Sequence, residues 1–204
     1  MNLRYGVLGG GSWGTAIVKM LSENNDVINW YVRSDENVSS IKENGKNPKY
    51  LRSINLKMSK INPSSSIIEV VNKSEVLILA IPSPFVDDEL KKIKHLISEK
   101  KIFSALKGVI PESHLIVSEH LNKFYKIPFS QIGIITGPCH AEEVALEKLS
   151  YITVACKNKT IGTEMTNSLM SNYINVKFSK IQWGLNMQLC LKMYMPSWLV
   201  FAMV

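Results

Sequence analysis

Three glycines near the start of the chain have the spacing of a nucleotide-phosphate site. Gly9, Gly11 and Gly14 form a G-x-G-x-x-G turn between the apolar run 3–8 and a segment, 13–21, whose apolar residues recur at helical spacing. In this pattern the first glycine permits a tight turn, the second lets backbone approach a pyrophosphate, and the third lets the helix pack on its strand. Phosphates would bind the free N–H groups of the helix. The pattern predicts a dinucleotide-binding turn rather than a glycine-rich hairpin.

Arg33 is a candidate for choosing between the two nicotinamide cofactors. It ends the apolar run 27–32, about 20 residues after the glycines, where a dinucleotide-binding unit contacts the adenosine ribose. An acidic residue there accepts hydrogen bonds from the ribose of NADH, whereas arginine suits a 2′-phosphate or stacks on adenine. We therefore expect NADPH rather than NADH. Two alternatives stay open: the nearby Asp35 could bind the ribose of NADH, or Arg33 could simply be a solvated side chain at the strand end.

The elements that must position these residues follow an alternating order. Ligands of open α/β sheets bind at the carboxyl ends of the strands. The alternation predicts an α/β fold with a Rossmann-type, mostly parallel sheet and flanking helices, and a loop over 57–66. The expected strands are 3–8, 27–32, 67–71, 76–81, 102–106, 132–136, 151–155 and 174–178. Beyond the helix after the glycines, the expected helices are 84–99, 112–125, 140–148 and 160–171.

Composition narrows the class of protein further. The 204 residues are 46% hydrophobic, which suits one full domain and part of a second, and their net charge of +7 is spread along the chain. No basic run interleaved with aromatic residues predicts nucleic-acid binding. Cys139, Cys156 and Cys190 lack the spacing of a zinc site or a disulfide framework, so we expect no metal and a reducing, cytoplasmic setting. We expect neither a signal peptide nor a membrane span.

Five segments stand out together, and four of them fall at expected strand ends: Gly-Gly-Gly-Ser-Trp-Gly-Thr-Ala at 9–16, Asn-Pro-Lys-Tyr-Leu at 47–51, Ala-Ile-Pro-Ser at 80–83, Ser-Ala-Leu-Lys-Gly at 104–108 and Gly-Pro-Cys-His-Ala-Glu-Glu-Val at 137–144. In order and spacing these matching segments resemble the bacterial NAD(P)-dependent glycerol-3-phosphate dehydrogenases over residues 1 to about 180. The resemblance implies reversible hydride transfer between NADPH or NADH and dihydroxyacetone phosphate, which gives sn-glycerol 3-phosphate for phospholipid synthesis. It also implies a Rossmann domain over 1–180 followed by an all-α substrate domain.

The resemblance assigns substrate contacts to three residues. Lys107 matches a position that contacts both cofactor and substrate, and a lysine at a strand end can hold an anion by charge-assisted hydrogen bonds. Gly137 and Cys139 match positions that approach the substrate. Cys139 departs from the family, which has a serine or threonine there, and a thiol is the weaker hydrogen-bond partner. We therefore expect Cys139 to affect substrate affinity.

The resemblance also adds cofactor contacts. Ser12 and Trp13, at the helix start, and Ala141, near the nicotinamide, match cofactor-contacting positions. His140 is a candidate acid–base residue, but its place after Gly-Pro at an expected helix start favours a structural or capping role. The full set of expected cofactor contacts is Gly9, Gly11, Ser12, Trp13, Gly14, Arg33, Lys107 and Ala141.

Residues 181–204 depart from the resemblance. They hold one charged residue, Lys192, with four of the nine methionines and two of the four tryptophans. A membrane segment would need about 20 uninterrupted apolar residues, which this stretch does not contain. A helix of a divergent substrate domain is a second interpretation.

A shifted reading frame is the third interpretation of this stretch, and we favour it. Back-translating from Gly184 and moving the frame by one base gives Val-Glu-Tyr-Ala-Ala-Val-Leu-Lys-Asn, which resembles the family helix that carries the catalytic lysine. We therefore hypothesise a one-base slip near Lys180, with 181–204 an aberrant apolar tail and the all-α domain essentially missing. No residue of this chain is assigned the catalytic lysine's role, Lys192 included.

Two other functions stay open from the sequence. A stand-alone nucleotide-binding module, tethered by its apolar tail, is one. Another two-domain dehydrogenase that acts on a hydroxyacid is the other, although the segments 104–108 and 137–144 argue against it. For the intact family member the resemblance allows a homodimer and implies a small phosphorylated substrate as partner.

Overall fold

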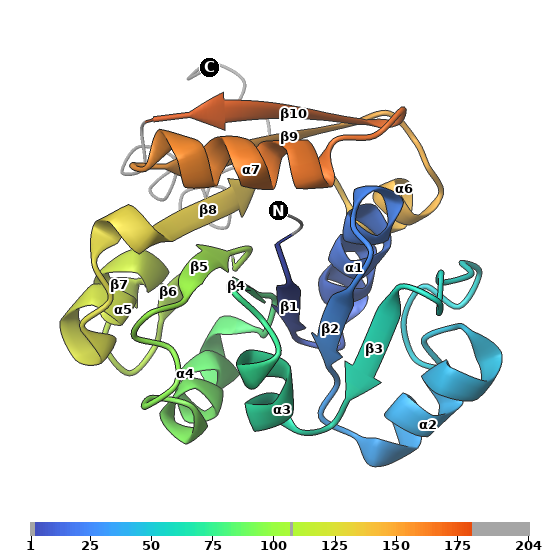
Figure 1. The fold of residues 1–204 in the computed structure, drawn as a ribbon, viewed down its shortest axis with the longest axis horizontal. Coiled ribbons are helices and arrows are strands. Elements are labelled where there is room, and N and C mark those ends of the chain that lie inside the picture. The colour runs from blue at the N-terminus through green and yellow to red at the C-terminus, as the bar shows by residue number, and fades with distance from the viewer. Residues whose placement is uncertain (1–2, 107, 181–204) are drawn as a thin grey trace.

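The computed structural model describes residues 3–106 and 108–180, and within them an eight-stranded sheet forms the centre of the molecule (Figure 1). The strand order is β10-β9-β8-β5-β4-β1-β2-β3. Neighbours from β8 to β3 run parallel, β9 is antiparallel to β8, and β10 is parallel to β9. This confirms the expected mostly parallel sheet. The strands are β1 Tyr5–Leu8, β2 Ile28–Tyr31, β3 Ile61–Ser64, β4 Val76–Leu79, β5 Lys101–Ser104, β8 Ile132–Thr136, β9 Ser150–Cys156 and β10 Ile174–Ser179.

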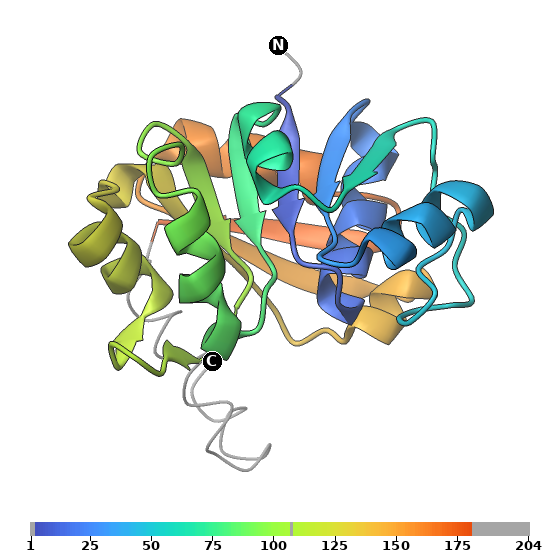
Figure 2. The ribbon, with the colours of Figure 1, turned by 90° about the horizontal axis from the view of Figure 1, so that it is seen from below.

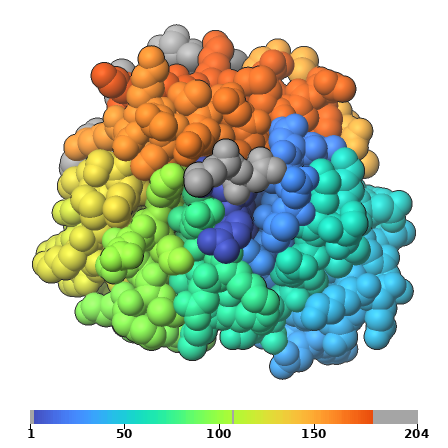
Figure 3. Space-filling model, viewed as in Figure 1, coloured from blue at the N-terminus to red at the C-terminus, as the bar shows by residue number. Residues whose placement is uncertain are grey.

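Helices cover both faces of the sheet because its central strands are apolar on both sides. On β4, Ile78 packs with the cluster that includes residues of α1 and α7, whereas Leu77 and Leu79 pack with α3, α4 and α5. The two ends of the domain meet where α1 contacts α7, seen as blue beside orange in Figure 3. The helices are α1 Ser12–Asn24, α2 Asp35–Asn44, α3 Ile67–Asn72, α4 Ser83–Lys92, α5 Val117–Tyr125, α6 Ala141–Ala145 and α7 Lys159–Leu169, and a hairpin joins β6 Val109–Ile110 to β7 Leu115–Ile116.

The expected strand over 67–71 is wrong, because this segment forms α3. The Ser66 side chain accepts a hydrogen bond from the Glu69 N–H at 3.3 Å and caps the helix. Ile67 and Val70 are buried, whereas Ile68 and Glu69 are exposed, so the buried residues follow helical rather than strand spacing.

The third strand in sequence, β3, lies inside the expected loop 57–66. Only Ile61 and Pro63 of this strand are buried, and β3 is an edge strand. A proline has no N–H for a ladder and is tolerated at such an edge. The short strand and its proline explain why the sequence pattern indicated a loop.

Several helices also differ from expectation. Helix α2 was not expected, because it buries only Val38 and Ile41, but Ser34 caps its start and Gly45 ends it in the left-handed region. The first part of the expected helix 112–125 forms the β6–β7 hairpin instead. Helix α4 ends at Lys92, short of the expected 99.

A buried carboxylate joins α4 to α5. Oδ1 of Asp87 accepts a hydrogen bond from the Tyr125 hydroxyl at 2.7 Å and lies 2.7 Å from Nε2 of His120, while Oδ2 lies 2.9 Å from Nζ of Lys91. Burial acts to raise the pKa of Asp87, but hydrogen bonds from Lys91, Tyr125 and His120 outweigh it and lower the pKa to about 2. The carboxylate is therefore charged at neutral pH.

We expect Asp87→Asn to change how stability depends on pH. The pKa of Asp87 is lower in the folded chain than its ordinary 3.8, so its stabilisation is present above 3.8 and is lost as the pH falls to about 2. The variant should lose about 2 kcal/mol of unfolding free energy at neutral pH and lose less stability than the wild type on acidification through that window. Urea unfolding followed by circular dichroism at several pH values measures both effects. Asp88→Asn, which alters an exposed neighbour on the same helix, is the control, and an unchanged pH profile for Asp87→Asn would contradict the assignment.

Candidate nucleotide-binding site

The turn between β1 and α1 is held so closely that two of its glycines cannot be replaced without movement. Gly9 has φ +134°, its carbonyl accepts a hydrogen bond from Nε1 of Trp30 at 2.9 Å, and a Cβ there would lie 2.5 Å from the carbonyl oxygen of Ala80. A Cβ on Gly14 would collide with the carbonyl oxygen of Gly9. Gly9 and Gly14 therefore bring the start of α1 down onto the end of β1, as the sequence predicts.

Gly11 has a different role, because a Cβ there would meet nothing within 4 Å. It is the N-cap residue of α1 and has φ −77°, which any residue can adopt. Within this described helix no side chain caps the first N–H groups, and no acidic residue lies in the first turn. The uncapped, positive end of the helix thus faces open space, the arrangement that binds phosphate.

A buried asparagine supports this turn from the side. Nδ2 of Asn47 donates hydrogen bonds to the carbonyl oxygen of Gly10 at 3.0 Å and to Oγ1 of Thr15 at 2.8 Å. Oγ1 of Thr15 in turn donates to the carbonyl oxygen of Gly11 at 2.8 Å. Together with the bond from Trp30 to Gly9, these bonds occupy the carbonyl oxygens of all three glycines, whereas the first N–H groups of α1 have no side-chain cap.

A cleft of about 310 Å³ opens from this turn at the carboxyl ends of β1, β2 and β4. Gly9 and Gly11 line one end of the cleft, and the exposed cations Arg33 and Lys49 line it further along. Tyr50 and Phe85, 45% and 55% exposed, add aromatic surface. A cleft with an anion site, two cations and aromatic faces suits a nucleotide.

Arg33 and the nearby Asp35 differ in their relation to the cleft, because only Arg33 lines it. Asp35 does not line the cleft, and its Oδ1 accepts a hydrogen bond from the Ser65 hydroxyl. Ser34 caps α2 by accepting the Asn37 N–H at 3.3 Å. The cleft therefore has a guanidinium and no Asp35 carboxylate at the end of β2.

Glu89 is the acidic residue among those that line the cleft. It is buried, and its Oε2 accepts hydrogen bonds from the Tyr31 hydroxyl at 3.0 Å and from Nζ of Lys92 at 2.9 Å. Burial and the Glu89 carboxylate together raise the pKa of Tyr31 to about 12. Tyr31 therefore stays a hydrogen-bond donor, which ties β2 to α4 across the cleft.

The expected substrate residues Gly137 and Cys139, and Ala141, which is expected near the nicotinamide, lie at a different strand end. Gly137 follows β8, and β5 and β4 separate that strand from β1. A Cβ on Gly137 would collide with the Tyr151 carbonyl oxygen, and Cys139 and Ala141 are buried in the apolar cluster that contains α1 residues. None of the three lines the 310 Å³ cleft in the described structure. Lys107 lies outside the described residues.

The other expected contacts lie at the start of α1 and α6. Ser12 and Trp13 are half-buried in the first turn of α1, and Trp13 packs on the apolar core. His140 precedes α6, and its backbone N–H donates to the Glu143 carboxylate at 3.4 Å while its carbonyl oxygen accepts the Glu143 N–H at 3.1 Å. His140 therefore stands at the N-cap position of α6, where the Glu143 side chain binds its backbone N–H.

Sequence reasoning gave no chemical role to several residues that build the cleft. Asn47, Lys49 and Tyr50 belong to a matching segment, but only the structure shows that this loop returns to the glycine turn. Phe85 and Glu89 are one turn apart on α4, and that i, i+4 spacing behind the strand end at Pro82 was the available signal.

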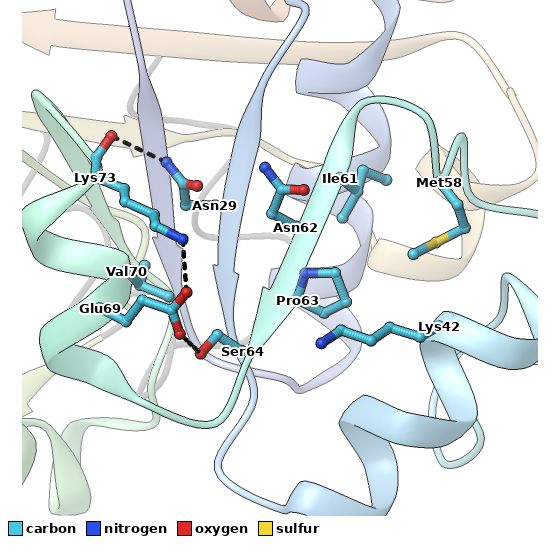
Figure 4. A pocket seen from close by; sticks show the side chains of 10 residues that line it. All are labelled: Asn29, Lys42, Met58, Ile61, Asn62, Pro63, Ser64, Glu69, Val70 and Lys73. Atoms are coloured by element: carbon cyan, nitrogen blue, oxygen red, sulfur yellow. Dashed lines mark hydrogen bonds and ion pairs between the residues drawn. The ribbon is translucent and has the colours of Figure 1, made fainter.

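A larger cavity, of about 480 Å³, lies at the β3 edge of the sheet (Figure 4). Its charges are largely paired with each other, since Nζ of Lys73 lies 2.6 Å from Glu69, whose other oxygen accepts the Ser64 hydroxyl at 2.5 Å. Neither the glycine turn nor the start of α1 lines it. The smaller cleft is therefore the candidate nucleotide site.

The mostly parallel sheet, covered by helices on both faces, and the glycine turn define a dinucleotide-binding domain of the Rossmann type. A family model described as "NAD-dependent glycerol-3-phosphate dehydrogenase N-terminus" matches residues 5–162. The chain therefore belongs to the NAD-dependent glycerol-3-phosphate dehydrogenase family.

Similar proteins agree with this assignment. The glycerol-3-phosphate dehydrogenase [NAD(P)+] of Pseudomonas syringae pv. syringae is 30% identical over 186 residues, which cover 91% of this chain and 54% of the relative. That of an Exiguobacterium species is 32% identical over 184 residues, 87% of this chain and 54% of the relative. This chain thus spans about half the length of these relatives. The glycerol-3-phosphate dehydrogenase of Saccharomyces cerevisiae shares the fold, with a TM-score of 0.84, 23% identity, and coverage of 94% of this chain and 60% of that one.

No helix among the described residues is long and apolar enough to cross a membrane.

We expect Gly14→Ala and Gly11→Ala to differ sharply in stability. The Gly14 variant forces α1 away from β1 and should lose about 2 kcal/mol or more. The Gly11 variant places its methyl group in open space and should stay within about 0.5 kcal/mol of the wild type. Thermal unfolding followed by circular dichroism compares them. Equal losses for the two variants would show that the packing described for Gly14 does not limit stability.

Proposed function

We propose that this chain binds NADPH in the 310 Å³ cleft as the cofactor half of a glycerol-3-phosphate dehydrogenase. The observation that carries the proposal is the uncapped start of α1, which faces the space kept open by Gly11. Family membership supports the reaction, the reduction of dihydroxyacetone phosphate to sn-glycerol 3-phosphate. That the product serves glycerophospholipid synthesis is part of the proposal and rests on the resemblance. When bound, the nicotinamide group supplies the hydride.

In this proposal the residues of this chain bind the cofactor and orient it. The N–H groups at Ser12 and Trp13 hold the pyrophosphate, and Gly9 and Gly14 keep these groups in place. Arg33 holds a ribose 2′-phosphate by charge-assisted hydrogen bonds. The donor set fits the group, because the cleft offers N–H groups and cations where the cofactor has phosphates.

The substrate contacts of the proposal rest on the resemblance. Lys107 follows the end of β5 by three residues, and we assign it contact with both the cofactor and the substrate phosphate or carbonyl. Gly137, Cys139 and Ala141 follow β8, and we assign the first two to the substrate and Ala141 to the nicotinamide. The Cys139 thiol is expected to bind the substrate less strongly than a hydroxyl would.

We infer further that the 204-residue chain binds nucleotide without appreciable turnover. The family segment Leu-Lys-Asn, whose lysine the resemblance makes catalytic, does not occur in its sequence. General acid–base catalysis raises the reaction rate of typical enzymes by roughly two to four orders of magnitude. Measurable reduction of dihydroxyacetone phosphate by this chain would overturn the inference.

The frame of residues 181–204 is part of the proposal. These residues lie outside the described structure, and we propose that a one-base slip near Lys180 separates them from the family's helical domain, so that the Rossmann domain is 1–180. Sequencing the DNA from codon 175 onward tests this. Recovery of one base and of a frame that encodes Leu-Lys-Asn is the expected result, and an unshifted frame through codon 204 would contradict it.

Cofactor binding gives the direct test of the site. Gly11→Ala should weaken NADPH binding by about tenfold or more, because its methyl group occupies the phosphate space, while stability is kept. Titration of the purified chain, followed by NADPH fluorescence, measures the dissociation constant. If the Gly11 variant binds as tightly as the wild type, the phosphates do not lie at the start of α1.

Cofactor choice should depend on Arg33. We expect Arg33→Ala to weaken NADPH binding by about tenfold and NADH binding by less than twofold, since only NADPH carries the 2′-phosphate. Arg4→Ala is the matched control, because Arg4 is exposed, paired with Glu75 at 3.6 Å and placed before β1, away from the cleft. Equal effects of Arg33→Ala on both cofactors would assign Arg33 to the adenine rather than to a phosphate.

Two broader inferences complete the proposal. Cys139 and Cys156 are buried and form no disulfide with each other in the described structure, which supports a reducing, cytoplasmic setting. For the complete family member we propose a homodimer that acts on a small phosphorylated substrate, with no nucleic acid or membrane as partner. Mass measurement in solution tests the dimer.

A further inference from the structure

Glu89 is a buried carboxylate in the wall of the nucleotide cleft, and the proposed function gives it no role. It lies on α4 and is 7% exposed. A carboxylate accepts hydrogen bonds and repels phosphates, so the part of a nucleotide that lies against it must donate a hydrogen bond and carry no negative charge. Glu89 therefore limits which part of a nucleotide can contact α4.

One oxygen of this carboxylate is bound by the protein and the other faces the cleft. The Tyr31 hydroxyl and Nζ of Lys92 both donate to Oε2, at 3.0 and 2.9 Å. No donor among the described residues binds Oε1. Oε1 is not one of the enclosed, unpartnered polar atoms of the described side chains, so it reaches the open space of the cleft. A ligand in the cleft can therefore donate the hydrogen bond that Oε1 lacks.

The partners of Oε2 hold the carboxylate in this orientation. Tyr31 ends β2, and burial together with the Glu89 carboxylate raises the pKa of Tyr31 to about 12, so its hydroxyl stays a donor at neutral pH. Lys92 binds the same oxygen from a position three residues further along α4. With two donors on Oε2, Oε1 is the oxygen that the carboxylate presents to the cleft.

The surroundings of Glu89 suit the flat face of a base. Phe85 lies one turn before Glu89 on α4 and lines the same cleft. Ile81 and Pro82, just after β4, and Val32, just after β2, add apolar surface. Figure 2 shows α4 in green beside β4, on the face of the sheet nearer the viewer. Aromatic and apolar side chains bind the face of a base, and a polar group at the edge of the base determines which base is accepted.

The groups that suit phosphate lie on other segments of the cleft. The start of α1 follows Gly11, Arg33 follows β2, and Lys49 lies on the loop that Asn47 anchors. Phosphates bind best to these N–H groups and cations, so the uncharged base is the part of the cofactor that suits α4. Adenine has a 6-amino group, which donates hydrogen bonds, whereas a 6-oxopurine has an oxygen there, which accepts them.

We propose that Glu89 selects the adenine base of the cofactor, with Oε1 accepting a hydrogen bond from the 6-amino group. The inference rests on the proposed function, in which the cleft binds NADPH. Neither the glycine spacing nor the family resemblance assigns a contact to Glu89. A 6-oxopurine would place its oxygen against the carboxylate, and the resulting repulsion excludes it from the cleft.

Two cofactors that differ only at position 6 of the base test this selection. NADPH and the reduced form of nicotinamide hypoxanthine dinucleotide phosphate are titrated into the purified full chain and followed by nicotinamide fluorescence. The wild type should bind NADPH about tenfold more tightly or better. Glu89→Gln should reduce the ratio to about twofold or less, because an amide can accept from the amino group or donate to the oxygen. Part of this change is tighter binding of the hypoxanthine cofactor, which a misfolded variant would not show.

Asp88→Asn is the matched control. It makes the same change from acid to amide on the same helix, at a side chain that is 74% exposed and does not line the cleft. This control should leave the ratio of the two affinities unchanged. Equal binding of the two cofactors by the wild type overturns the inference. Equal weakening of both by Glu89→Gln also overturns it, because that result assigns the carboxylate to a ribose hydroxyl.

Failure of the proposed function is recognised separately. If the wild type binds neither cofactor, the proposed function fails, and AMP and IMP are then titrated by calorimetry. A preference for AMP that Glu89→Gln removes supports the selection of adenine without the dinucleotide. Equal binding of AMP and IMP, or binding of neither, overturns the inference together with the proposed function.

Discussion

The closeness of α1 to β1 is the constraint on which the site depends. Hydrogen is the largest group that fits at Gly14 against the carbonyl oxygen of Gly9, and Gly9 adopts a backbone angle that other residues rarely take. This contact places the first turn of α1 at the carboxyl end of the sheet, where its N–H groups have no partner within the helix. Packing and anion binding therefore have one cause, and the bonds of Asn47 and Thr15 keep the carbonyl groups from competing with it.

The two faces of the sheet divide the remaining tasks. The face covered by α1 and α7 joins the two ends of the domain, where Nζ of the buried Lys19 donates to Glu147 at 2.8 Å and to Tyr173 at 2.9 Å. Burial opposes the charge of Lys19, but these two partners outweigh it and raise its pKa. The face covered by α3, α4 and α5 carries the polar chain around Asp87. Long-range polar pairs thus tie together segments that are far apart in sequence on both faces.

The sheet and the glycine turn could be predicted from sequence because each depends on local pattern. The runs of β1, β4 and β8 are buried at consecutive positions rather than at helical spacing, and the glycines are fixed by sterics that any such turn shares. Over 67–71 the same approach failed, because a short run of isoleucine and valine fits either period. There the capping bond of Ser66 and the packing of Ile67 and Val70 decided for the helix.

The cleft was less predictable than the turn, because its walls come from segments that meet only in three dimensions. Arg33 could be placed by its distance from the glycines. Lys49 and Tyr50 are brought to the cleft by a loop that Asn47 anchors, and no spacing in the sequence indicates this return. Glu89, on α4, is bound at the cleft by Tyr31 of β2. Contacts of this kind depend on the assembled sheet.

Pro63 affects whether the β3 edge of the sheet can pair with a strand of another molecule. Lys60 and Ser64 accept hydrogen bonds from β2 through their carbonyl oxygens, so the backbone of Ile61 and Pro63 faces outward from the edge strand. Proline offers no N–H there, and the Ile61 N–H donates to the Met58 carbonyl oxygen at 3.4 Å. A strand from a second molecule would find no donor with which to continue the ladder. The same residue that hid β3 in the sequence therefore protects this side of the sheet from edge-to-edge aggregation.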